Sequence, residues 1–169
     1  DFCIRINYDN SYITIKNNIL RDFTRAGIYC YYHSSYLTIE ENEIIFDEET
    51  EGFNGIEISG SMDSRIEDNI FYGEFDNDSK YFRGIGIELY DSYSIVVENN
   101  QFSDISNAVD VYNSLECEII SNNITKLHSG IRIIRSTLNL VSNNTISLKE
   151  NGFGVLLLQS LNNNISYNI

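Results

Sequence analysis

The sequence predicts an all-β fold, a right-handed single-stranded parallel β-helix of about six or seven coils with an Asn ladder. Three observations support this prediction. A short motif that contains Asn recurs along the whole chain, a second motif that begins with a small residue recurs ahead of it, and both alternate apolar and variable residues. Because strands this short bury one face only by stacking on equivalent strands, the repeat predicts a solenoid.

The first motif reads Ile or Val, two variable residues, Asn, a variable residue and an apolar residue. Its Asn positions are separated by 24, 27, 31, 22, 22 and 24 residues. A residue that returns in this way occupies the same place in each coil, where its amide can bond to the backbone and to the Asn above and below. The seven positions are Asn18, Asn42, Asn69, Asn100, Asn122, Asn144 and Asn168.

The second motif is a Gly or Ala followed by apolar, variable and apolar residues, as in Gly55-Ile56-Glu57-Ile58. The Asn of the first motif follows the small residue after 14 residues in five coils and after 15 in one. The alternation has the period of a strand with one buried face. A Ser commonly lies eight residues before the Asn, which favours a turn between the two strands.

The variable residues of the second motif point outward, so successive coils place them in columns. We expect the first outward column to contain Arg5, Tyr29, Glu57, Glu88, Asp110, Arg132 and Leu156. We expect the second to contain Asn7, Tyr31, Ser59, Tyr90, Tyr112, Ile134 and Leu158. Three successive carboxylates therefore form a line on an exposed face.

The carboxylates Glu57, Glu88 and Asp110 are candidate catalytic residues. Adjacent coils stack at roughly 4.8 Å, and glycoside hydrolysis uses two carboxyl groups roughly 5 Å apart for retention or about 6.5–9.5 Å apart for inversion. Glu88 lies between like charges, so we expect a raised pKa and the role of general acid, with Asp110 beside Arg132 as the base. The alternative is a solvated polar face without chemistry.

Aromatic and basic residues near this line are candidates for substrate binding. The rings of Tyr31, Tyr90 and Tyr112 offer faces for sugar stacking, and Arg132 and Arg83 offer positive charge. Tyr pairs between neighbouring strands also stabilise sheets that bind no ligand.

Two long connections, residues 45–54 and 72–84, come directly before the strands that carry Glu57 and Glu88. Long loops on a rigid scaffold often form binding sites. The first contains Asp47, Glu48 and Glu49, whose oxygen atoms suit calcium, although a solvated run of charge explains them as well.

The overall charge limits the partners. The chain has 25 Asp and Glu against 11 Lys and Arg, a formal net charge of −14. Nucleic acid and anionic membranes are therefore poor partners, and no run of 18 apolar residues predicts membrane insertion. An acidic glycan would need local Arg residues or a bridging cation.

The repeat G-I-x-I-x-x-S-x-x-x-x-I-x-x-N-x-I resembles the parallel β-helix repeat of the pectate-lyase-like superfamily, especially the NosD-like and the carbohydrate-binding and sugar-hydrolase (CASH) domain groups. The resemblance covers essentially the whole chain and implies an extracellular, cell-surface or periplasmic protein that engages polysaccharide, either as a hydrolase or lyase or as a non-catalytic structural or adhesion module. The Gly-His-Gly element of pectin-type hydrolases is absent, and the Asp-Pro-His of alginate epimerases cannot occur because the chain has no Pro. The resemblance is thus specific for the fold and leaves the activity open.

The repeat continues from the first residues to the last, so we expect one β-helix domain over residues 1–169. The chain starts inside one coil and stops inside another, without a capping helix. Solenoids need caps, so we expect a segment of a longer chain, or ends that pair with flanking domains or with another copy.

Overall fold

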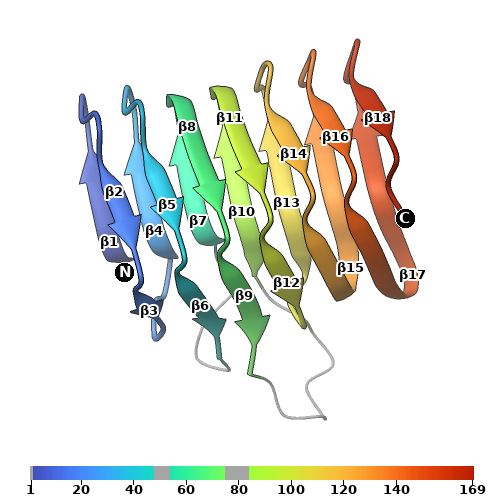
Figure 1. The fold of residues 1–169 in the computed structure, drawn as a ribbon, viewed down its shortest axis with the longest axis horizontal. Coiled ribbons are helices and arrows are strands. Elements are labelled where there is room, and N and C mark those ends of the chain that lie inside the picture. The colour runs from blue at the N-terminus through green and yellow to red at the C-terminus, as the bar shows by residue number, and fades with distance from the viewer. Residues whose placement is uncertain (1, 48–53, 75–83) are drawn as a thin grey trace.

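A computed structural model describes residues 2–47, 54–74 and 84–169, and these residues form strands that stack coil upon coil (Figure 1). Each coil begins with a strand that carries the second motif or, in β1, its equivalent with Cys3 in the place of the small residue. These strands are β1 (Phe2–Asn7), β4 (Ala26–Tyr31), β7 (Asn54–Ser59), β10 (Ile85–Tyr90) and β13 (Asn107–Tyr112).

A second strand in each coil leads into the ladder Asn. These strands are β2 (Thr14–Lys16), β5 (Thr38–Glu40), β8 (Met62–Glu67), β11 (Tyr93–Glu98), β14 (Glu118–Ile120), β16 (Leu140–Ser142) and β18 (Asn164–Ser166). The third strands are β3 (Ile19–Leu20), β6 (Glu43–Phe46), β9 (Ile70–Gly73) and β12 (Gln101–Ser103). In the last coils, β15 (Asn123–Ile134) and β17 (Thr145–Leu158) run on from the third position into the first position of the next coil.

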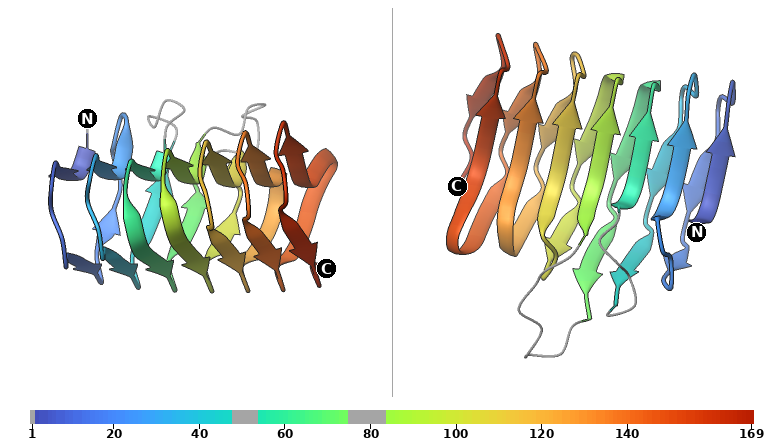
Figure 2. Two further views of the ribbon diagram at one scale, coloured as in Figure 1. Left: turned by 90° about the horizontal axis from the view of Figure 1, so that it is seen from above. Right: turned by 180° about the vertical axis from the view of Figure 1, so that it is seen from behind.

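The strands pair only in parallel within the described ranges, and each strand pairs with its equivalent in the neighbouring coils. The second strands form a 7-stranded sheet in the order β18-β16-β14-β11-β8-β5-β2. The first and third strands form an 11-stranded sheet because β15 belongs to both sets. Figure 2 shows the coils side by side from the N-terminal to the C-terminal end. The predicted all-β parallel solenoid is therefore confirmed.

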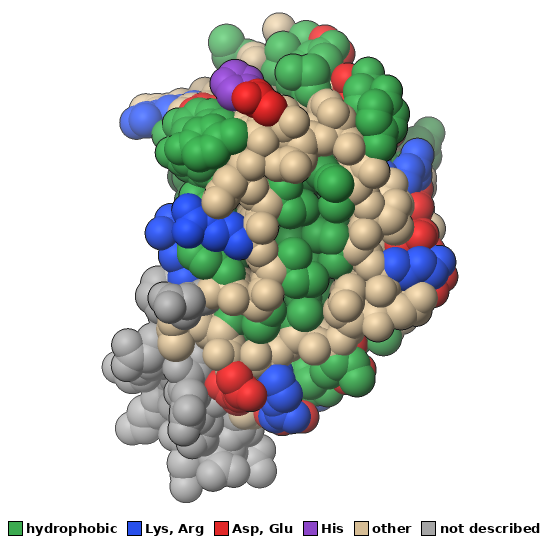
Figure 3. Space-filling model, turned by 90° about the vertical axis from the view of Figure 1, so that its left-hand side faces the viewer, with side chains coloured by type: hydrophobic (Ala, Val, Ile, Leu, Met, Phe, Trp, Pro, Cys, Tyr) green, Lys and Arg blue, Asp and Glu red, His purple; other side chains and the backbone are tan. Residues whose placement is uncertain are grey.

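The interior of the coils is a continuous apolar column. Equivalent side chains such as Ile56, Ile87 and Val109 lie directly above one another and are fully buried. The rings of Phe71 and Phe102 stack at 4.7 Å between their centroids. Figure 3 looks onto the β1 end of the stack, where apolar side chains lie inside a surround of backbone and uncharged polar side chains.

The predicted Asn ladder is present. Within it, the backbone N–H and Nδ2 of one Asn donate to Oδ1 of the next; for Asn100 and Asn122 these distances are 3.0 and 3.1 Å. The Nδ2 of Asn122 also donates to the backbone oxygens of Val97 and Ile120. The residue before each ladder Asn has a left-handed backbone, for example φ 55° at Asn99, which turns the chain into the third strand.

Two further ladders line the turn before the second strand. Backbone N–H groups donate to the Oγ of Ser92, Ser114, Ser136 and Ser160 in the next coil, which agrees with the Ser turn expected from the sequence. A short Asn ladder, in which Asn139 donates to Asn163 Oδ1 at 2.9 Å, was not expected from the sequence. Among the described residues no helix is long and apolar enough to cross a membrane.

Candidate functional site

The residues of the predicted outward column lie in register in adjacent coils. Glu57 pairs with Glu88, Glu88 with Asp110, and Asp110 with Arg132 in strands β7, β10, β13 and β15. Each carboxylate is therefore one strand spacing, roughly 4.8 Å, from the next along the stack. The second column pairs in the same way, with Ser59, Tyr90 and Tyr112 in register.

Glu57 and Glu88 share a hydrogen-bond donor that the sequence analysis did not identify. Nδ2 of Asn54, at the start of β7, lies 2.6 Å from Oε2 of Glu88 and 3.3 Å from Oε2 of Glu57. Both Glu side chains are half-buried. The two carboxyl groups thus converge on one amide, an arrangement compatible with the roughly 5 Å separation of retaining glycosidases.

Burial raises the pKa of Glu88 above its ordinary value. The hydrogen bond from Asn54 lowers this pKa, the charges of Glu57 and Asp110 raise it, and the charge of Arg132 lowers it. The direction agrees with the expectation from the sequence, but the largest cause is removal from water and not repulsion between carboxylates.

Asp110 departs from the expectation of an exposed column because its side chain is fully buried. Nε of Arg132 donates to Oδ1 of Asp110 at 2.7 Å, and Nη2 of Arg132 donates to Oδ2. This hydrogen bond raises the pKa of Arg132. The side-chain amide of Asn107 contacts this ion pair. In one orientation its Nδ2 lies 3.3 Å from Oδ2 of Asp110. In the flipped orientation its oxygen accepts from Nη2 of Arg132 at 3.0 Å.

The predicted sugar-stacking tyrosines lie in two groups. Tyr90 and Tyr112 are neighbours in register, and the hydroxyl of Tyr112 accepts from Nη2 of Arg132 at 3.2 Å. Tyr31 is two strands away from Tyr90, beyond Ser59, and packs edge-on against Tyr32 with 4.2 Å between the ring centroids.

A pocket of about 510 Å³ opens beside Tyr90 and Tyr112, where β10, β13, β15 and β17 end. Its remaining walls come from residues that the sequence analysis did not assign to a site. They are Asn113, Ile134, Arg135, Leu158 and Gln159.

Three residues were predicted to hold calcium, namely Asp47, Glu48 and Glu49. Asp47 is described and half-buried, whereas Glu48, Glu49 and the predicted substrate-binding Arg83 lie outside the described residues. No group of three or more His, Cys, Asp or Glu that could hold a metal ion occurs in residues 2–47, 54–74 and 84–169.

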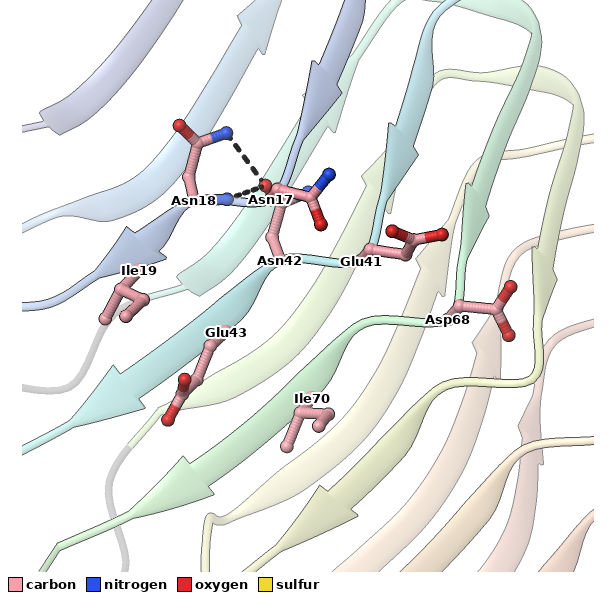
Figure 4. A pocket seen from close by; sticks show the side chains of 8 residues that line it. All are labelled: Asn17, Asn18, Ile19, Glu41, Asn42, Glu43, Asp68 and Ile70. Atoms are coloured by element: carbon pink, nitrogen blue, oxygen red, sulfur yellow. Dashed lines mark hydrogen bonds between the residues drawn. The ribbon is translucent and has the colours of Figure 1, made fainter.

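A second pocket, of about 310 Å³, lies over the first Asn ladder positions and contains three carboxylates. Figure 4 shows that Glu43 points away from Glu41 and Asp68. The hydroxyl of Tyr72 donates to Oε1 of Glu43 at 2.7 Å, a bond that raises the pKa of Tyr72 to about 12. These carboxylates therefore do not converge on one point.

The sequence contains a signal for Asn54 and Asn107, which were not among the predicted site residues. Asn54 and Asn107 each come directly before the small residue of the second motif, and each lies three residues before a carboxylate of the column. Asn54 and Asn107 begin β7 and β13, and both are in register with Ile85 of the strand between them, β10.

The chain belongs to the family described as the right handed beta helix region, which it matches over residues 2–103 and 85–169. A search of curated proteins gave no match.

Two solved structures share the fold. The chain is 15% identical to a mutant of the periplasmic alginate epimerase AlgG, with a TM-score of 0.67, and the match covers 99% of this chain and 47% of the epimerase. It is 12% identical to the enzymatically active domain of bacteriophage CBA120 tailspike protein 2, with a TM-score of 0.59, over 96% of this chain and 26% of that domain. The chain thus spans less than half of either protein, and at these identities the likeness extends to the fold alone.

Proposed function

We propose that this chain is an extracellular or surface protein that binds a polysaccharide on the outer face of strands β7, β10, β13 and β15. One observation carries the proposal: Glu57 and Glu88 in adjacent coils converge on the amide of Asn54, with Tyr90 two residues after Glu88 and Tyr112 in register with Tyr90. Paired carboxylates supply hydrogen-bond acceptors for sugar hydroxyls, and tyrosine rings supply stacking faces. The fold shared with a periplasmic alginate epimerase and a phage tailspike domain supports a polysaccharide as the ligand and a location outside the cytoplasm.

The same geometry supports a glycosidase or lyase-like reaction in which Glu88 acts as the acid. A carboxyl group whose pKa is raised by burial retains its proton at higher pH and can donate it to a leaving oxygen. Glu57 is then a better partner than Asp110, because both oxygens of Asp110 are bonded to Arg132 and the side chain is fully buried. Asp110 is therefore proposed to position Arg132 and, through it, Tyr112.

A non-catalytic glycan-binding or structural module is the second candidate. The burial of Asp110 favours this candidate. Of the three carboxylates in the predicted line, Asp110 is fully buried, and Glu57 and Glu88 are half-buried and accessible to a ligand. A module of this kind would use the same face and the same tyrosines.

Glycan-array binding, with and without calcium, combined with an assay of reducing-sugar release on the bound glycans, tests these proposals. Binding together with release that is abolished in Glu88→Gln supports the hydrolase. Release of unsaturated products supports the lyase. Binding without any cleavage supports the module, and the absence of binding to any glycan contradicts the proposed function.

Glu118→Gln is the matched control. Glu118 is an exposed carboxylate on β14, in the other sheet of the coil. We expect this variant to bind and to act as the wild type does. An equal loss in both variants would contradict the assignment of the site to the Glu88 face.

A further inference from the structure

Three arginines of this acidic chain form no ion pair with a carboxylate of the described residues, namely Arg5, Arg25 and Arg135. The other Lys and Arg residues within those ranges each pair with Asp or Glu. Of the three, Arg135 lies next to a strand of the candidate site. Arg5 is on β1, Arg25 comes directly before β4, and Arg135 comes directly after β15. In a chain with 25 acidic residues, an arginine without a carboxylate partner is a candidate contact for an anion.

Arg135 lines the 510 Å³ pocket beside Tyr90 and Tyr112. Its Nε donates to Oε1 of Gln159, another lining residue, at 3.0 Å, and both side chains are exposed. Its Nη1 and Nη2 atoms have no partner among the described residues. Two such neighbouring nitrogens can bind a carboxylate in a parallel, two-bond geometry.

The other walls of this pocket suit a sugar ring. Tyr90, Tyr112, Ile134 and Leu158 supply apolar and aromatic surface, whereas the amides of Asn113 and Gln159 supply hydrogen-bonding groups. A mostly apolar pocket with a few directed polar groups is typical of a site for a small ligand.

The pocket adjoins the proposed glycan site. Tyr90 lies two residues after Glu88 on β10, and Tyr112 bonds to Arg132. A glycan that contacts Glu88 therefore reaches this pocket by extending along the same sheet face.

We propose that the pocket is a subsite for an acidic sugar and that the guanidinium of Arg135 binds its carboxylate. This inference rests on the glycan binding proposed above and adds the chemical class of the ligand. The net charge of −14 repels polyanions at long range, so recognition depends on local contacts. Arg5 and Arg25, whose guanidinium carbons lie 5.2 and 5.3 Å from the centre of the Phe2 ring, offer a second contact at the other end of the face.

Calorimetric titration with a uronic-acid oligosaccharide and with its carboxyl-reduced, neutral counterpart tests the proposal. We expect the wild type to prefer the acidic oligosaccharide, and Arg135→Gln to weaken its binding roughly 10- to 100-fold, the worth of a charge-assisted hydrogen bond. Arg135→Lys should restore part of the loss because it keeps the charge without the two-bond geometry. Lys126→Gln, which removes an exposed cation paired with Asp104, should bind as the wild type does.

The outcomes separate this inference from the proposed function. Equal affinity for the acidic and neutral oligosaccharides, or unchanged binding by Arg135→Gln, would overturn the assignment of Arg135 and leave glycan binding in place. If the wild type binds neither oligosaccharide nor any glycan on an array, both proposals are overturned. Circular dichroism of each variant identifies any loss of fold, and Arg135→Lys keeps the test valid if Arg135→Gln unfolds.

Discussion

Arg132 and Asp110 form an ion pair across two adjacent coils, in which the Asp side chain is fully buried and the Arg side chain is about one-quarter exposed (26%). The pair also fixes Tyr112, which accepts from the same guanidinium. A buried carboxylate of this kind is retained only where its charge is compensated, so the pair is part of the folded structure as well as of the candidate site.

Removing the charge of Asp110 should therefore destabilise the protein. In Asp110→Asn the guanidinium of Arg132 loses its counter-charge in a half-buried position, and we expect a loss of about 3 kcal/mol in the free energy of unfolding, measured by urea denaturation. Asp104, which pairs with Lys126 and Lys149 near the surface, provides the control. Asp104→Asn should lower the free energy of unfolding by about 1 kcal/mol or less. Equal losses in the two variants would contradict a larger contribution of the buried ion pair to stability.

The Asn ladder provides a test within one dipeptide. Asn122 is buried and exchanges hydrogen bonds with Asn100 and Asn144, whereas the next residue, Asn123, is exposed. We expect Asn122→Ala to lower the free energy of unfolding by about 3 kcal/mol, since several buried donors and acceptors lose their partners. Asn123→Ala should change it by about 0.5 kcal/mol at most. Similar effects of the two substitutions would contradict the ladder.

The small residue that begins the second motif is required by close packing in some coils only. A methyl group on Gly86 would lie 2.6 Å from the Phe102 ring and 2.7 Å from the carbonyl oxygen of Ala108, whereas one on Gly154 would meet only Ile146 at 4.0 Å. Gly86→Ala should therefore cost about 1–3 kcal/mol of unfolding free energy. Gly154→Ala should be neutral or slightly stabilising. Thermal unfolding of both variants measures this difference, and the reverse order would contradict it.

The raised pKa of Glu88 predicts a pH-dependent contribution to stability. Because burial raises this pKa in the folded state, the contribution is fully present below the unfolded value of about 4.3. It is lost as the pH rises through the folded value. The stability of the wild type relative to Glu88→Gln, which titrates no proton at this position, should therefore fall between pH of about 4 and neutrality. Urea denaturation of both proteins across this range measures the difference, and a constant difference would exclude the shift.

Asn54 should lower the pKa of Glu88, since its amide donates to the carboxylate at 2.6 Å. In Asn54→Ala that stabilisation of the charged form is lost, so we expect the pKa of Glu88 to rise above its wild-type value. Titration of the Glu88 carboxyl carbon by NMR measures the change. Asn123→Ala, which removes an exposed amide on β15, is the control and should leave the titration curve in place.

Most of the fold and part of the site were predictable from the sequence. The recurrence of Asn and of the small residue places Glu57, Glu88, Asp110 and Arg132 in one row, and the structure pairs them in that row. The short ladder of Asn139 and Asn163 was missed because two members are too few to form a visible period. The alternation of residues in a strand predicts which side chains point away from the core, but it does not predict which neighbouring side chains cover them.

The sequence by itself determined the coil, its register and the face on which the carboxylates lie, because a repeat with two constant positions allows one stacking of equivalent strands. Only the tertiary structure decided the environment of each side chain on that face. In the folded chain Asp110 is buried against Arg132, and Asn54 donates hydrogen bonds to Glu57 and Glu88. The tertiary structure also placed Arg135 in a pocket with Tyr90 and Tyr112. These contacts depend on side-chain directions and turn conformations in neighbouring coils, for which the period of the sequence carries no information.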